Sequence, residues 1–75
     1  IKYDEIKDLF SERELQIIKM ICKEDKSKEI ADKLFINVRT VETHRKNVME
    51  RCGAKNIIGV ILFAIKSGII TVDEL

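Results

Sequence analysis

The sequence predicts a small all-α domain, a bundle of four helices. Its 75 residues are enough for one domain and no more. With 45% hydrophobic residues it is too apolar for a disordered chain, and it contains no proline to interrupt a helix. Four segments with apolar residues at helical spacing are separated by capping residues and glycines.

Residues 1–10 are mixed in charge and only weakly patterned. We interpret them as the remnant of a linker, in which Ile6, Leu9 and Phe10 could form one short apolar helical turn. The chain begins at Ile1 rather than at Met, so we expect it to be a piece of a longer protein. The predicted domain covers residues 11–75.

The first two helices are marked by their caps. Ser11 and Glu14 form the pattern of a capping box at the start of the first helix. The apolar pattern stops in "KEDKS", which is typical of a turn, and Ser27 is the expected cap of a short second helix. That helix should end near Phe35 and Ile36, which we expect to be core residues.

The third and fourth helices are bounded in the same way. Asn37 is the expected cap of the third helix, and Gly53 should close it in a left-handed conformation. Asn56 should cap the fourth helix and Gly68 should close it. The two isoleucines after Gly68 are expected to fold back onto the core.

A helical wheel gives the third helix two different faces. The inward stripe contains Val41, Val48 and Cys52, flanked by Met49 and Arg45. The outward arc contains Arg39, Glu42, Thr43, Lys46 and Glu50. An ordinary solvated face would also be charged, so the arc alone does not identify a binding surface.

The position of this helix favours a binding role. It is the longest and most basic element, since residues 38–55 hold five Lys/Arg and two Asp/Glu, a net charge of +3, whereas residues 1–37 carry −1. It also follows a short helix and a tight turn. That is the layout of a helix-turn-helix, whose second helix enters the major groove of DNA.

The segment "KEIADKLFINVRTVETHRKNVMERCGAKN" resembles the LuxR/NarL/FixJ family of DNA-binding domains. The resemblance runs from about Phe10 to Ile70. It implies sequence-specific binding of double-stranded DNA by a transcriptional regulator, as the C-terminal output domain of a two-component response regulator or of a quorum-sensing regulator. It also implies an N-terminal receiver or sensor domain in the full-length protein.

The resemblance assigns roles to residues by position. The predicted base-contacting residues are Glu42, Thr43 and Lys46, whose carboxylate, methyl and ammonium groups suit cytosine, thymine and guanine. The predicted phosphate-contacting residues are Lys28, Arg39, Thr40, His44, Arg45, Lys55 and Asn56.

Three positions depart from the family pattern. Glu24 stands where relatives usually have glycine, so the turn after the first helix should differ or be mildly strained. Lys26 aligns with the Ser or Thr cap of the second helix, which places the expected cap one residue later. Arg51-Cys52-Gly53 replaces a "KLG"-like ending and keeps the turn glycine.

The fourth helix is apolar on nearly every side, unlike that of relatives. Such a helix must bury a second face, so we predict a homodimer interface of Ile57, Ile58, Leu62 and Ile65. Docking onto an attached receiver domain stays open, as does an unusually apolar surface. A helical protein–protein interaction module that uses this helix is the alternative function. Gly59 would let another backbone approach closely.

Other classes of function find little support. Cys22 and Cys52 lack the spacing of a zinc site, and two reduced core thiols are favoured over a disulfide. The run "IIGVILFAI" is about half the length that crosses a bilayer. The single histidine has no partners for catalysis. We therefore expect a cytoplasmic protein that is not an enzyme, has no cofactor and does not bind a membrane.

Overall fold

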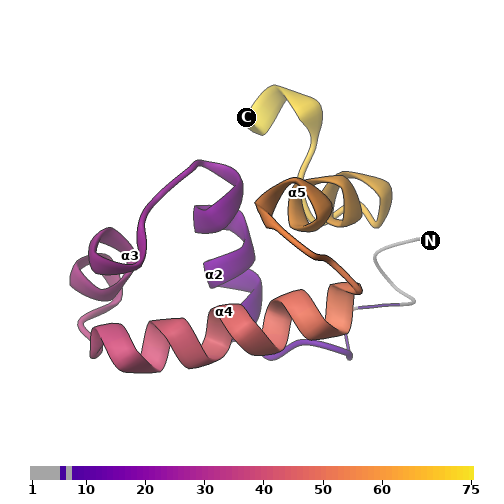
Figure 1. The fold of residues 1–75 in the computed structure, drawn as a ribbon. Helices are drawn as coiled ribbons and strands as arrows, with labels where there is room; N and C mark the ends of the chain where they lie inside the picture. The colour runs from indigo at the N-terminus through magenta and orange to yellow at the C-terminus, as the bar shows by residue number, and fades with distance from the viewer. Residues whose placement is uncertain (1–5, 7) are drawn as a thin grey trace.

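The computed structural model describes residue 6 and residues 8–75, and over these residues it is all-α. Its helices are α2 (Glu12–Cys22), α3 (Ser27–Leu34), α4 (Val38–Cys52) and α5 (Ile57–Lys66), followed by a single 3-10 turn, η1 (Val72–Glu74). In Figure 1, α4 runs along one side of the molecule, α3 lies at its N-terminal end, and α5 lies near its C-terminal end. The predicted four-helix fold with a helix-turn-helix, formed by α3 and α4, is confirmed.

The predicted caps are present at three helix starts. The Ser11 hydroxyl accepts from the Glu14 amide at 3.1 Å, and the Glu14 carboxylate accepts from the Ser11 amide at 2.9 Å. The Asn37 side chain accepts from the Arg39 amide at 2.7 Å, and Asn56 caps α5 in the same way. These local bonds fix the helix starts because they satisfy amides that have no partner within the helix.

The start of α3 differs from the prediction. Ser27 is the first helical residue, and Lys26 occupies the cap position. A lysine side chain has no acceptor for a helix amide. The Glu29 carboxylate instead accepts from the Lys26 amide at 2.9 Å, which is half of a capping box.

The turn before α3 keeps the geometry that glycine favours, although the residue is Glu24. Its φ is +66°, in the left-handed region, and its amide donates to the Ile21 carbonyl at 2.9 Å. A residue with a Cβ is disfavoured there by about 1 kcal/mol. The predicted strain is therefore found at Glu24 itself, and the turn is retained.

Phe35 is not a core residue, so the prediction for it is wrong. Its side chain is 94% exposed, and its φ of +56° makes it the left-handed C-cap of α3. This conformation reverses the chain direction after α3, so that Ile36 packs against the core while Phe35 projects outward. The prediction for Ile36 is confirmed.

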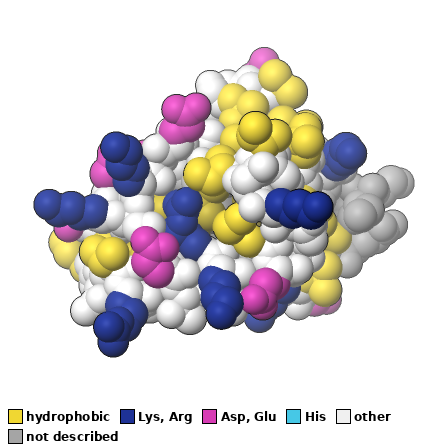
Figure 2. Space-filling view, in the orientation of Figure 1, with side chains coloured by type: hydrophobic (Ala, Val, Ile, Leu, Met, Phe, Trp, Pro, Cys, Tyr) yellow, Lys and Arg dark blue, Asp and Glu magenta, His cyan; other side chains and the backbone are white. Residues whose placement is uncertain are grey.

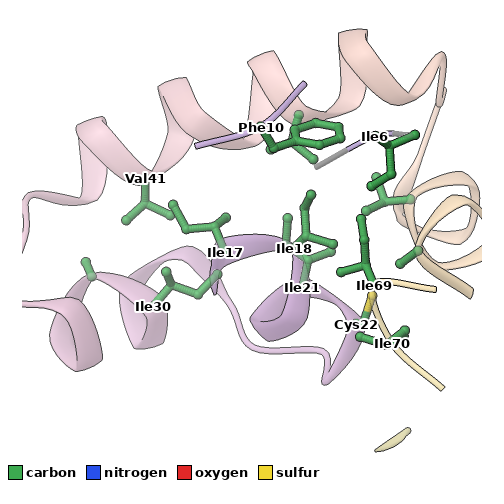
Figure 3. Close-up of a cluster of buried hydrophobic side chains, with 14 residues drawn as sticks. Ile6, Phe10, Ile17, Ile18, Ile21, Cys22, Ile30, Val41, Ile69 and Ile70 are labelled. Carbon is green, nitrogen blue, oxygen red and sulfur yellow. The ribbon is translucent and has the colours of Figure 1, made fainter. Parts of the chain in front are cut away.

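The core lies where α2 meets the other helices. Figure 3 shows Ile17 of α2 between Val41 of α4 and Ile30 of α3, and all three are fully buried. Farther along, Phe10 packs edge-on against Phe63 of α5, with 6.0 Å between the ring centroids. The two isoleucines after Gly68 are buried, as predicted. The α4 axis is thereby fixed by contacts to α2, α3 and α5.

The described part of the predicted linker contributes to this core. Ile6 and Phe10 are both buried, while Leu9 is about half exposed. The start of the domain at residue 11 stays a prediction, and residues 1–5 and 7 lie outside the described residues.

The two cysteines are free thiols. Burial, with a smaller contribution from Cys52, raises the pKa of the Cys22 thiol to about 11, and burial also raises the pKa of Cys52. Both thiols are therefore protonated near neutral pH and weakly reactive.

Candidate nucleic-acid interface

Helix α4 has one buried and one exposed face, as the helical wheel predicts. Val41 and Val48 are fully buried, and Met49 and Cys52 pack against the core. All five residues of the outward arc are exposed: Arg39, Glu42, Thr43, Lys46 and Glu50. The valines fix the rotation of α4, so these five side chains must project into solvent.

The charge distribution on the molecular surface follows this arrangement. Figure 2 shows Lys and Arg side chains spaced along the edge where α4 runs, with acidic side chains between them, and hydrophobic side chains gathered near α5 and the C-terminal segment. The described residues enclose no detectable pocket. The candidate interface is the exposed face of a helix, an element that the major groove of DNA can admit.

The three predicted base-contacting residues lie together on this face. Glu42, Thr43 and Lys46 are all exposed and lie in the N-terminal half of α4, which begins at Val38. The Thr43 hydroxyl donates to the Arg39 carbonyl at 3.1 Å, one turn back along α4. Their assignment to bases stays a prediction.

The predicted phosphate-contacting residues flank the same face at several points. Lys28 lies exposed in the first turn of α3, and Arg39 and Thr40 lie exposed in the first turn of α4. Lys55 and Asn56 are exposed just before α5. The Asn56 side chain already accepts from the Gly59 amide at 3.2 Å, so its amide nitrogen is left as a donor. The phosphate contacts of these residues stay predictions.

His44 and Arg45 are less accessible than the other predicted contacts. Both are half-buried, and Arg45 lies on the inner side of α4. Its Nη1 atom is buried and has no hydrogen-bond partner in the structure. Burying a donor without a partner costs about 1–3 kcal/mol. The assignment of His44 and Arg45 to phosphates stays a prediction.

An ion pair that the sequence analysis did not identify holds the C-terminal half of α4. Arg51 Nη1 donates to Glu14 Oε1 at 2.6 Å and to the Leu9 carbonyl at 3.1 Å. The Glu14 side chain is buried, and its Oε1 also accepts from the Ser11 amide. The cap of α2 is thus tied to the end of α4.

The predicted dimer surface on α5 is partly exposed. Ile58 is 66% exposed, Leu62 is 50% exposed and Ile57 is 37% exposed, whereas Ile65 is half-buried against the core. The opposite side of α5 presents Val60 and Ala64 to the core, where both are fully buried. A second apolar face of α5 therefore lies on the surface.

Two other kinds of site find no support in the described part of the chain. No group of three or more His, Cys, Asp or Glu side chains in it could hold a metal ion. None of its helices has the length and apolar character that crossing a bilayer requires.

Comparison with known proteins identifies the family. Residues 8–64 match the GerE family, described as bacterial regulatory proteins of the luxR family. No solved structure gives a match.

Two relatives illustrate the similarity. The transcriptional regulatory protein YxjL of Bacillus subtilis (strain 168), itself described as uncharacterized, is 31% identical over 67 residues, which are 89% of this chain and 31% of YxjL. The oxygen regulatory protein NreC of Staphylococcus aureus (strain JH9) is 41% identical over 58 residues, 77% of this chain and 27% of NreC. This chain thus spans about three tenths of the length of these relatives. It belongs to the luxR family of bacterial regulatory proteins and is a helix-turn-helix, DNA-binding domain of a transcriptional regulator.

Proposed function

We propose that the chain binds duplex DNA by placing α4 in the major groove, with its N-terminal half against the bases. The observation that carries this proposal is the exposed arc of α4, from Arg39 to Glu50, on a helix whose rotation is fixed by buried valines. A carboxylate, a threonine and a lysine in this arc offer three different chemistries to base edges. The role requires no chemistry on the DNA.

The basic residues around α4 supply the affinity that does not depend on sequence. Lys28 is exposed in α3, Arg39 is exposed in α4, and Lys55 is exposed in the turn before α5. Cations that neutralise phosphates release counterions, so binding should weaken as salt rises. The net charge of +1 on the whole chain is compatible with binding to phosphates, because the excess of positive charge is confined to residues 38–55.

Replacing Lys46 with alanine tests the role of α4. We expect Lys46→Ala to weaken binding to a duplex selected from a random library by about tenfold, because one direct base contact is lost. Binding to an unrelated duplex should change much less. Both affinities are measured by titration of labelled duplex at two salt concentrations.

Lys66→Ala is the matched control, since Lys66 is exposed at the far end of α5. It removes the same charge and should leave specific binding almost unchanged. Equal losses in the two variants would mean that α4 does not face the bases.

For the whole protein we propose a two-component response regulator in the cytoplasm, with an N-terminal receiver domain that controls this domain. The relatives NreC and YxjL, described as regulatory proteins, are between three and four times as long as the matched segment, which covers 27% of NreC and 31% of YxjL. That length leaves room for a second domain before the output domain.

We also propose that two copies associate through the exposed face of α5, which Ile57, Ile58 and Leu62 form. These residues share one surface next to the partly buried Ile65. A two-fold dimer would place two α4 helices about one DNA turn, roughly 34–36 Å, apart. The alternative, a module that binds other proteins through α5, accounts for this surface but not for the polar arc of α4.

A charge at the centre of this surface tests the dimer. We expect Leu62→Glu to keep the chain monomeric at concentrations where the wild type self-associates, because a carboxylate would have to be buried. Sedimentation equilibrium without DNA measures this. Phe35→Glu is the control, since it places the same charge on an exposed apolar residue at the far end of α3. Self-association that survives Leu62→Glu would exclude this interface.

A further inference from the structure

The segment before α2 is packed into the DNA-binding fold, although its sequence has the weak apolar pattern of a linker. Ile6 and Phe10 are 3% and 5% exposed and belong to the same core cluster as the buried residues of α2 and α4. The Leu9 amide donates to the Ile6 carbonyl at 2.9 Å, so the segment closes a turn of its own. Figures 1 and 3 show that it runs beside the C-terminal half of α4.

This segment bridges the two helices that flank the turn between α4 and α5. The Leu9 carbonyl accepts at 3.1 Å from Nη1 of Arg51, which lies in the last turn of α4. The Phe10 ring packs edge-on against Phe63 of α5, with 6.0 Å between the ring centroids. Two consecutive residues are thus attached to the two helices that residues 53–56 join. While the segment is docked, the two ends of that turn are held relative to each other.

The same turn contains two of the predicted DNA contacts. Lys55 and Asn56 are exposed there, and α4 with its exposed arc comes directly before them. If α4 and this turn bind one DNA molecule together, the turn must keep a fixed position relative to α4. Docking of the segment and binding of DNA then favour the same conformation of the domain. Two events that favour one conformation strengthen each other.

We propose that this segment, Ile6 and residues 8–10, is a regulatory strap through which a preceding domain changes the affinity for DNA. The strap is an element with two states, docked and released. A domain that pulls it away from Arg51 and Phe63 frees the turn after α4 and weakens DNA binding. The inference rests on the proposed function, because it needs DNA to be bound by α4 and by that turn.

Hydrogen exchange of backbone amides measures docking of the strap in the unmodified 75-residue chain. The chain is compared alone and bound to a duplex enriched from a random-sequence library. Linkage requires DNA to strengthen docking by the factor by which docking strengthens DNA binding. We therefore expect the duplex to slow exchange of the Leu9 amide at least about fivefold more than exchange of the Ile70 amide. Ile70 is the matched control, since its amide donates to the Ala64 carbonyl of α5 from the segment at the other end of the chain.

Two substitutions test the coupling in the opposite direction. Ile6→Ala removes apolar contacts from the strap, and Ile70→Ala makes the same change at a residue that is 4% exposed and equally buried. We expect Ile6→Ala to bind the enriched duplex at least about fivefold more weakly than Ile70→Ala. Circular dichroism and urea denaturation verify that both variants are folded under the conditions of the titration. If either variant fails to fold, the exchange experiment decides alone, because it needs no substitution.

The outcomes distinguish the strap from the proposed function. If no duplex is enriched over bulk DNA, sequence-specific binding itself fails, and the strap fails with it. If a duplex is bound but slows the Leu9 and Ile70 amides equally, DNA only stabilises the fold as a whole, and the strap alone is overturned. A folded Ile6→Ala that binds the duplex as tightly as Ile70→Ala overturns the strap as well, while the proposed role of α4 is kept.

Discussion

Replacing Arg51 with methionine should lower the free energy of unfolding by about 2–3 kcal/mol. Arg51 Nη1 donates to Glu14 Oε1 at 2.6 Å and to the Leu9 carbonyl at 3.1 Å. Methionine keeps most of the aliphatic stem but leaves the buried Glu14 carboxylate with only its bond from the Ser11 amide. An incompletely paired buried charge is more costly than a missing surface contact.

The exposed pair between Lys33 and Asp25 provides the control. Its N–O distance of 2.8 Å is similar, but its side chains are more exposed, 55% for Lys33 and 13% for Asp25 against 46% for Arg51 and 8% for Glu14. Arg51 also donates to the Leu9 carbonyl, whereas Lys33 donates to Asp25. Lys33→Met should therefore cost less than about 1 kcal/mol. Urea denaturation of both variants measures the difference. Similar losses in Arg51→Met and Lys33→Met would show that burial of Glu14 does not strengthen its pair.

The dependence of stability on pH provides a second measurement of the same pair. Burial raises the pKa of Glu14, but hydrogen bonds from Ser11 and Arg51 and the charge of Arg51 outweigh burial, so its pKa lies below the ordinary value of 4.5. A lowered pKa in the folded state gives stability that is complete above the unfolded pKa and is lost as pH falls through the folded pKa. The wild type should therefore lose more stability below about pH 4.5 than Arg51→Met, and the two should converge in acid.

Local chemistry explains why most of the fold could be predicted. Ser11 with Glu14, Asn37 and Asn56 mark helix starts through bonds to amides two or three residues away, so adjacent letters suffice to identify them. The valines of α4 determine its buried face by helical periodicity alone.

What could not be predicted depends on contacts between distant residues or on backbone turns. Glu14 and Arg51 are 37 residues apart, and only the packing of α2 against α4 brings them together. In "LFI", the left-handed turn at Phe35 shifts the phase of the apolar pattern, so that the aromatic residue is exposed and Ile36 is packed. In the candidate site, the wheel predicts that Thr43 is exposed but not that its hydroxyl bonds to Arg39. The helical wheel also places Arg45 on the inward side of the helix, but it does not show that one of the Arg45 nitrogens has no hydrogen-bond partner.

Alanine at position 59 should destabilise the fold by about 1–2 kcal/mol, although alanine is normally the better helix residue. Gly59 lies in α5, and a Cβ built on it would be 2.8 Å from Cβ and 3.2 Å from Cα of Ala54. Real Cβ atoms do not approach so closely. The close approach that the sequence indicates at Gly59 is therefore made by the turn between α4 and α5 of the same chain, not by the backbone of a second copy.

A double-mutant cycle separates this contact from the helix preference of alanine. Gly59→Ala gains about 0.5–1 kcal/mol of helix propensity and loses more through overpacking against Ala54. Ala54→Gly removes the opposing Cβ, so in the double variant the propensity gain should remain while the 2.8 Å contact disappears and only the 3.2 Å contact to Cα is left. Urea denaturation of all four proteins should therefore give a favourable coupling of at least about 1 kcal/mol between the two substitutions. If the effects of the two substitutions on the free energy of unfolding are additive, the turn at Ala54 accommodates the new Cβ without cost. Gly59 would then not be what fixes α5 against the end of α4. Lys55 and Asn56, two residues predicted to contact DNA phosphates, lie in that turn. A measured coupling would therefore also mean that the contact between Gly59 and Ala54 helps to set their position relative to α4.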